Sequence, residues 1–217
     1  MTNRVAIGLV LALGLAACRS APESPPPTDT RLQRGIDAIE GGRASEGIEL
    51  LEGALTGGAL TDAERLTAHR FAGHAWTLER DPERALEHYE RGIALDPVDP
   101  WLRYATGVAL REVGANERAE ASFSSAIELD PSHLKALQFR AELRMARSDY
   151  EAAKADLDRT LALIDAAEPA TLRAWGGDPS ELRRWTLHRR ALCHGMLGDR
   201  DAARRDEEAA TALAAGP

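Results

Sequence analysis

The feature that most constrains the fold of this chain is an internal repeat of 34 residues. The stretch from Leu66 to Pro97 aligns without a gap on the stretch from Pro100 to Pro131. The residues that match in this register are Gly73 with Gly107, Ala85 with Ala119, Tyr89 with Phe123, Leu95 with Leu129, and Asp96-Pro97 with Asp130-Pro131. A repeat of this length predicts structural units that each pack only on their neighbours, so it determines the architecture before any local motif does.

Weaker copies of the repeat extend over most of the chain. One copy precedes the clear pair and is separated from it by a slip of four residues, and two copies follow it. A 16-residue insertion divides the last two copies. We therefore expect repeats at 28–61 (degenerate), 66–99, 100–133, 134–167 and 184–217, with the insertion at 168–183.

Each copy contains two amphipathic runs of helical length. Apolar residues recur at three- and four-residue spacings, as in Ala85, Tyr89 and Ile93, and no stretch alternates with period two over enough residues to indicate a sheet. Small residues such as Gly73 and Gly107 would let the two helices of a unit approach closely. The sequence predicts an all-α chain with helices at about 29–41, 44–56, 62–79, 82–95, 99–113, 116–129, 132–146, 149–167, 179–197 and 200–214.

Capping residues mark several of the expected helix starts. Aspartate precedes proline at four places, an order that combines an N-cap with a residue suited to the first turn. Two further stretches have the spacing of a capping box. These signals are Asp81-Pro82, Asp99-Pro100, Asp130-Pro131, Asp178-Pro179, Thr61-x-x-Glu64 and Ser148-x-x-Glu151.

The pattern of small, aromatic and proline positions resembles the tetratricopeptide repeat over residues 31–217. The resemblance implies an α-solenoid of about five helix-turn-helix pairs, in which the first helices line a concave groove that binds peptides or protein segments. Carried over by the 34-residue register, the expected groove residues are Arg70, His74, Thr77, Trp101, Tyr104, Val108, Arg111, Gln138, Glu142, Met145, Trp185, His188 and Leu192.

The expected groove is aromatic and polar, without a row of lysines or arginines. It therefore does not favour a reader of C-terminal carboxylates. Some of the aromatic residues would also serve to seal the stack, and Trp101, at a helix start, fits either role. The partners expected are proteins or peptides, and no cofactor is expected.

The N-terminal segment predicts export and lipid anchoring. Residues Val5 to Ala17 carry no charge but are fewer than the about 20 apolar residues that span a bilayer. The run ends in Leu15-Ala16-Ala17-Cys18, which resembles the lipobox of bacterial lipoproteins. The resemblance implies a signal peptide at 1–17, a diacylglycerylated Cys18 and a proline-rich linker at 18–30. The alternative is that Cys18 is one more small apolar residue of a signal or a core helix.

The same resemblance indicates where the protein works. Arg19 follows Cys18, where an aspartate would resemble an inner-membrane retention signal. The expected location is thus the bacterial cell envelope, lipid-anchored at the outer membrane and facing the periplasm. The net charge of −8 argues against a nucleic-acid partner, because phosphate backbones attract basic surfaces.

The sequence lacks the motifs of common enzyme and metal sites, so we expect neither catalysis nor a metal ion. One alternative is a thiol-dependent enzyme around His188, Cys193 and His194, although a packed thiol beside two histidines explains these residues more simply. Another alternative is a structural envelope lipoprotein that associates with itself.

The insertion and the helix after it form the one basic and aromatic patch. It contains Arg173, Arg183, Arg184, Arg189, Arg190, Trp175 and Trp185. One interpretation is a lengthened loop whose tryptophan covers a hydrophobic seam. The other is an anchor for a partner, since tryptophan and arginine are enriched in interface hot spots.

Overall fold

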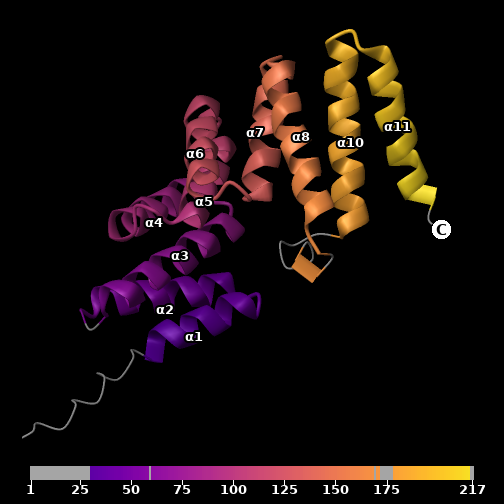
Figure 1. The fold of residues 1–217 in the computed structure, drawn as a ribbon. Coiled ribbons are helices and arrows are strands. Elements are labelled where there is room, and N and C mark those ends of the chain that lie inside the picture. The colour runs from indigo at the N-terminus through magenta and orange to yellow at the C-terminus, as the bar shows by residue number, and fades with distance from the viewer. Residues whose placement is uncertain (1–29, 59, 169, 172–177, 216–217) are drawn as a thin grey trace, which may run out of the picture.

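The computed structural model describes residues 30–58, 60–168, 170–171 and 178–215, and its helices form five consecutive pairs there (Figure 1). The pairs are α1 (Thr30–Glu40) with α2 (Ala44–Thr56), α3 (Asp62–Leu78) with α4 (Pro82–Leu95), α5 (Pro100–Glu112) with α6 (Asn116–Leu129), α7 (Leu134–Ala146) with α8 (Tyr150–Ala166), and α10 (Pro179–Met196) with α11 (Arg200–Ala215). These bounds lie within two residues of the predicted helix ends, and no strand is found in the described ranges.

The pairs stack one after another from α1 to α11, as the colour gradient of Figure 1 shows. The two helices of each pair contact each other, and the second helix of a pair contacts the first helix of the next: α2 with α3, α4 with α5, α6 with α7 and α8 with α10. This nearest-neighbour arrangement is the predicted α-solenoid.

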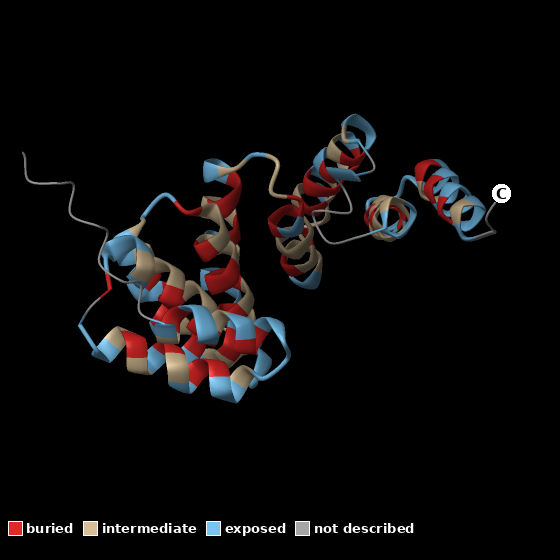
Figure 2. Ribbon diagram, turned by 90° about the horizontal axis from the view of Figure 1, so that it is seen from below, coloured by how far each residue is buried: buried red, intermediate tan, exposed pale blue. Residues whose placement is uncertain are grey.

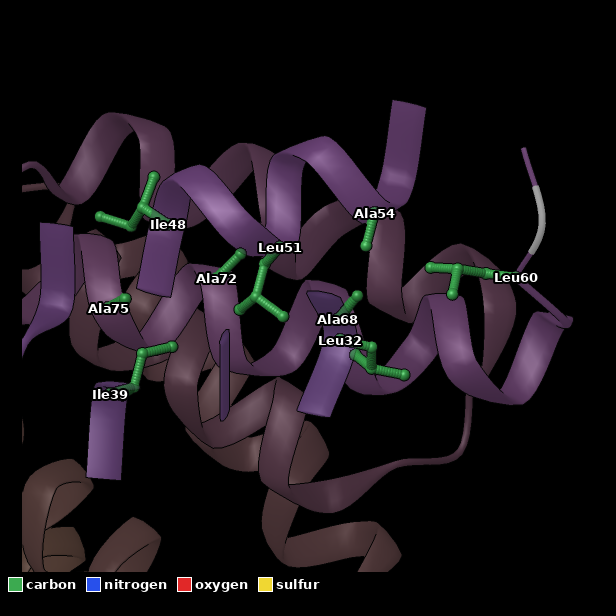
Figure 3. Close-up of a cluster of buried hydrophobic side chains, with 9 residues drawn as sticks. All are labelled: Leu32, Ile39, Ile48, Leu51, Ala54, Leu60, Ala68, Ala72 and Ala75. Atoms are coloured by element: carbon green, nitrogen blue, oxygen red, sulfur yellow. The ribbon is translucent and has the colours of Figure 1, made fainter. Parts of the chain in front are cut away.

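The hydrophobic core is divided among the junctions between helices instead of forming one central mass. Figure 3 shows one such cluster, which brings side chains of α1, α2 and α3 together with Leu60. In Figure 2 the buried residues follow the sides on which the helices meet. The members of the cluster are Leu32, Ile39, Ile48, Leu51, Ala54, Leu60, Ala68, Ala72 and Ala75.

The two repeat glycines allow the close helix packing that the sequence predicts. A Cβ built on Gly73 would lie 2.5 Å from Cε1 of Tyr89, and one on Gly107 would lie 2.6 Å from Cε1 of Phe123. In these two pairs the aromatic ring of the second helix therefore rests directly on the glycine of the first helix.

Several predicted helix starts are confirmed by their capping hydrogen bonds. Thr61 and Glu64 form a reciprocal capping box at the start of α3. The carboxylates of Asp81, Asp99 and Asp178 each accept a backbone N–H of the helix that follows. Side chains thus satisfy backbone donors that have no partner within their own helix.

Two predicted starts are wrong. The carboxylate of Asp130 accepts the backbone N–H and the hydroxyl of Ser132, so it closes a turn, and α7 begins later with His133 as its N-cap. Ser148 has a φ of 67°, and Asp149 caps α8 in its place. At Asp130 a short polar side chain binds a nearby backbone group instead of capping a helix. At Ser148 the positive φ departs from the extended backbone typical of an N-cap, and Asp149 accepts the N–H of Ala152.

The predicted signal peptide, Cys18 and nearly all of the linker lie outside the described residues, as do Arg173 and Trp175. Among the residues that the structure does describe, none of the helices has the length and hydropathy needed to cross a bilayer.

Candidate functional site

The N-terminal part of the expected groove contains a cavity of about 300 Å³ between α3 and the start of α5. The guanidinium carbon of Arg70 lies 4.8 Å from the centre of the Trp101 ring, and Arg70 Nη1 lies 3.4 Å from Oδ2 of Asp99, the buried N-cap of α5. Arg70 is thereby held against the ring. The residues that line this cavity are Thr67, Arg70, Phe71, His74 and Trp101.

Tyr104 lies at the seam between α5 and the next repeat. Its ring centre is 4.9 Å from that of His133, 5.8 Å from that of Phe139 and 6.0 Å from that of Phe123. Burial raises the pKa of the Tyr104 hydroxyl to about 12. Tyr104 thus contributes to packing between repeats.

A chain of charges crosses the groove from α5 through α7 to α10. Arg111 Nη1 lies 3.1 Å from Oε2 of Glu142, and Arg189 Nη2 lies 3.9 Å from Oε1 of the same carboxylate. The guanidinium carbon of Arg111 also stands 4.2 Å from the centre of the Phe139 ring. Glu142 therefore joins three successive first helices.

Two cavities flank Glu142 between α7 and α10. The first, of about 340 Å³, is lined by Gln138, Phe139, Glu142, Asp178, Glu181, Leu182 and Trp185. The second, of about 400 Å³, is lined by Glu142, Met145, Ala146, Tyr150, Arg189, Leu192 and Met196. Leu192 and Met196 are 54% and 59% exposed, so this part of the groove presents apolar surface to solvent.

Trp185 combines the two roles between which the sequence left a choice. It packs against the buried cluster of Ala141, Ala153, Leu157 and Cys193, and it also lines the first cavity beside Glu142. Two arginines of the same patch are engaged within the chain, since Arg183 pairs with Asp165 and Arg190 pairs with Asp158 and Asp206.

His188 lies on another side of α10. Its Nδ1 is 3.2 Å from Oε2 of Glu207 on α11, and it lines a groove of about 420 Å³ between these two helices, which shares Leu192 and Met196 with the second cavity. Glu207 occupies the register position that Tyr89 and Phe123 hold in earlier repeats. His188 is therefore not brought together with Trp185, Gln138 and Glu142 beside the cavities between α7 and α10.

Cys193 has the environment of a packed thiol. It is completely buried, and burial raises the pKa of its thiol, which opposes formation of the nucleophilic thiolate. The ring nitrogens of His194 are nearest to the carboxylates of Asp199 and Asp206, at 3.8 and 4.0 Å. Within the described ranges, no three His, Cys, Asp or Glu side chains are grouped to hold a metal ion.

Two charged links inside the solenoid were not predicted from the sequence. Arg140 Nη2 lies 2.6 Å from Asp156 Oδ1, and Arg190 Nη2 lies 2.7 Å from Asp206 Oδ1. Both pairs are separated by 16 residues and occupy the same repeat positions, a recurrence that could have revealed them. Each arginine also reaches the preceding second helix, through Ser124 at 3.0 Å and Asp158 at 2.8 Å respectively.

A buried histidine pair was also missed. Nδ1 of His69 lies 3.1 Å from Nδ1 of His88, and both side chains are buried between α3 and α4. Burial lowers the pKa of His69 to about 4 and lowers that of His88 as well. The 19-residue separation gives no local pattern, so only the packed helices reveal the contact.

Comparison with known proteins supports the fold. No family model matches the chain. It is 27% identical over 123 residues to the mouse protein O-mannosyl-transferase TMTC1, a match that covers 49% of this chain but only 13% of that protein.

Among solved structures, one of MamA has a TM-score of 0.69 at 15% identity and covers 84% of this chain and 89% of its own. MamA from Desulfovibrio magneticus RS-1 has a TM-score of 0.67 at 13% identity, covering 84% and 92%. YrrB, described as a TPR protein with an unusual peptide-binding site, has a TM-score of 0.65 at 13% identity, covering 84% of each chain. The 34-residue register, the paired helices and these likenesses agree that the chain has the tetratricopeptide-repeat solenoid fold.

Proposed function

We propose that this chain is a non-enzymatic adaptor that holds a peptide or helix of a partner protein in the groove between α7 and α10. The observation that carries the proposal is the pair of cavities on either side of Glu142. They offer aromatic, apolar and charged groups next to one another, which is the composition of surfaces that bind protein segments. The peptide-binding site named for YrrB supports the same use of the fold.

We further propose that lipid at Cys18 keeps the adaptor at the bacterial envelope, on the periplasmic side of the outer membrane. The support is the stretch Leu15-Ala16-Ala17-Cys18 with Arg19 after it. Two or three acyl chains are sufficient for stable anchoring, because each buried methylene contributes about 0.8 kcal/mol. Labelled palmitate should enter the wild-type protein and not Cys18→Ala, and label retained by that variant would refute the anchor.

Binding in the groove can be tested with substitutions that leave the core intact. Leu192→Glu and Met196→Glu place charges on exposed apolar positions, and Val98→Glu does the same at a position that is 67% exposed, outside the groove. In pull-downs from envelope extracts, the first two variants should lose partners that wild type and Val98→Glu retain. An identical set of partners for all four proteins would contradict the proposal.

A further inference from the structure

The insertion changes the groove at one place. It supplies Asp178, Glu181 and Leu182, which form one wall of the cavity of about 340 Å³ opposite Gln138 and Phe139 of α7. The helix α10 begins at Pro179, before the position 184 at which its repeat begins in the 34-residue register, whereas α7 begins at the register start. The additional first turn of α10 thus builds a wall that the regular repeat would not provide.

Resting on the function proposed above, we infer that this cavity is the subsite for a lysine or arginine side chain of the bound protein segment. Three carboxylates line it, those of Glu142, Asp178 and Glu181. Glu142 is paired with Arg111 and Arg189, but within the described part of the chain no lysine or arginine lies within salt-bridge distance of Asp178 or Glu181. Asp178 uses Oδ1 to cap α10, accepting from the backbone N–H groups of Ser180 and Glu181 at 2.9 and 3.2 Å.

The remaining walls of the cavity suit the stem of a long basic side chain. Trp185, Phe139 and Leu182 offer aromatic and aliphatic surface beside the carboxylates. Lysine and arginine bury their methylene stems along such surface while their charged ends contact ring faces and carboxylates. The chain makes the same contacts itself, since the guanidinium carbons of Arg111 and Arg189 lie 4.2 and 5.4 Å from the ring centres of Phe139 and Trp185.

The negative charge of the cavity favours a basic side chain over an anionic group. A carboxylate or phosphate would have to approach Asp178 and Glu181, two anionic side chains without a cationic partner among the described residues. Like charges brought together at an interface oppose binding, so the cavity selects against acidic segments and phosphate headgroups.

The second cavity defines the neighbouring position of the bound segment. Its lining is dominated by Met145, Ala146, Leu192 and Met196, and flexible methionine side chains adapt to differently shaped apolar groups. The parts of α10 that line the two cavities are about ten residues, or about 15 Å, apart. An extended chain covers this distance in about four or five residues. The inferred ligand therefore carries a basic residue and a large apolar residue separated by that number of positions.

Selection from random peptides tests the inference without knowledge of the natural partner. Random twelve-residue peptides displayed on phage are selected on the full-length protein in nonionic detergent. Enriched peptides are then made with a fluorophore, and their affinity is measured by fluorescence anisotropy for wild type, Glu181→Gln, Glu181→Lys and Leu192→Glu. Glu83→Lys is the matched control, because Glu83 is also an exposed acid in the first turn of a helix capped by aspartate.

The expected peptides contain lysine or arginine with a large apolar residue four or five positions away. Glu181→Lys should weaken their binding at least about tenfold, Glu181→Gln should weaken it less, and Glu83→Lys should leave it unchanged. Circular dichroism on each variant verifies the helical fold. Glu181→Gln removes the negative charge without adding a positive one, so it tests the same carboxylate with a smaller change.

The outcomes distinguish this inference from the proposed function. Peptides that lose binding in Leu192→Glu but lack a basic residue, or that bind Glu181→Lys as tightly as wild type, would overturn the basic subsite and leave groove binding intact. If no peptide is enriched, or if the enriched peptides bind Leu192→Glu unchanged, both the subsite and the groove proposal fail.

Discussion

At the scale of single residues, this fold depends on how closely two helices of a pair can approach. The ring of Phe123 fills the space that a side chain at residue 107 would need, and the ring of Tyr89 does the same at Gly73. Gly195, in contrast, lies in α10 with no atom within 4 Å of the place a Cβ would take. Glycines of one chain therefore have opposite expected responses to the same substitution.

We expect Gly107→Ala to lower the thermal midpoint and Gly195→Ala to raise it. A methyl group at residue 107 would meet the Phe123 ring at 2.6 Å, and overpacking of this kind costs about 1–3 kcal/mol. The methyl group at residue 195 meets no neighbour, and alanine in a helix is favoured over glycine by about 0.5–1 kcal/mol. Thermal unfolding followed by circular dichroism measures both, and a stabilising Gly107→Ala would contradict the packing described.

The buried pair His69 and His88 predicts a loss of stability in mild acid. The charged groups that face the pair are Glu52 on α2 and Glu87 and Arg91 on α4. The folded state holds the pKa of His69 at about 4, below the ordinary value of 6.5, so unfolding takes up a proton between these values. The contribution of the neutral His69 to the free energy of unfolding is complete above pH 6.5 and is lost as the pH falls to about 4.

This pH dependence can be measured by urea unfolding at pH 7.5, 5.5 and 4.5. His69→Gln should show a smaller decrease in the free energy of unfolding between these pH values than wild type. His188, which is exposed, provides the control His188→Gln, which should retain the decrease of the wild type. Equal pH slopes for wild type and His69→Gln would show that the buried pair is not responsible.

At the scale of helices, buried ion pairs join α7 to α8 and α10 to α11. Asp156 has a side chain only 5% exposed and lies 2.6 Å from Arg140 and 2.8 Å from Arg144. Asp158, two residues further along α8 and 44% exposed, pairs with Arg190 at 2.8 Å. The burial of an ion pair, and not the number of pairs, decides how much its loss lowers the free energy of unfolding.

We expect Asp156→Ala to cost about 3–5 kcal/mol of the free energy of unfolding, because the largely buried Arg140 loses its carboxylate partner and Arg144 keeps only Glu120. Asp158→Ala should cost about 1 kcal/mol or less, since solvent screens its more exposed pair. Urea unfolding at neutral pH compares the two variants. Equal costs would mean that the burial of Asp156 has little energetic effect.

At the scale of the whole molecule, the stacked pairs predict that a destabilising substitution affects mainly the helices near it. Each pair contacts only its neighbours, so stability is close to a sum of repeat and interface contributions. Asp206→Asn weakens the link from Arg190 to α11 at the C-terminal end. Amide hydrogen exchange should accelerate in α10 and α11 while α1 to α4 keep their protection. If hydrogen exchange accelerated equally in all helices, the solenoid would unfold as a single cooperative unit and this prediction would be wrong.

Much of the fold could be predicted because its signals are local and are repeated. Small residues and helix-capping residues recur at a spacing of 34 positions, so a weak signal in one copy is supported by the same position in the others. Two errors remained. The side chain of Asp130 binds a nearby backbone N–H instead of starting a helix, and Ser148 has a left-handed backbone, so Asp149 caps α8.

The candidate site was predictable only in part. The register identified Gln138, Glu142 and Trp185, which lie around one cavity, but it grouped His188 with them although that ring pairs with Glu207. Asp178 and Glu181 carry no repeat signal, because they belong to the insertion. Their position opposite Phe139 depends on how α10 packs on α8.

The sequence by itself determined the all-α class, the pairing of the helices, most of their ends and the close approach of helices at Gly73 and Gly107, because each depends on spacing along the chain. Only the tertiary structure decided which side chains meet: Arg144 with Asp156, His69 with His88, and the carboxylates of the insertion with the aromatic wall of α7 and α10. The reason is physical, since periodicity specifies the face on which a side chain lies, while contacts between faces depend on the angle and offset at which helices pack.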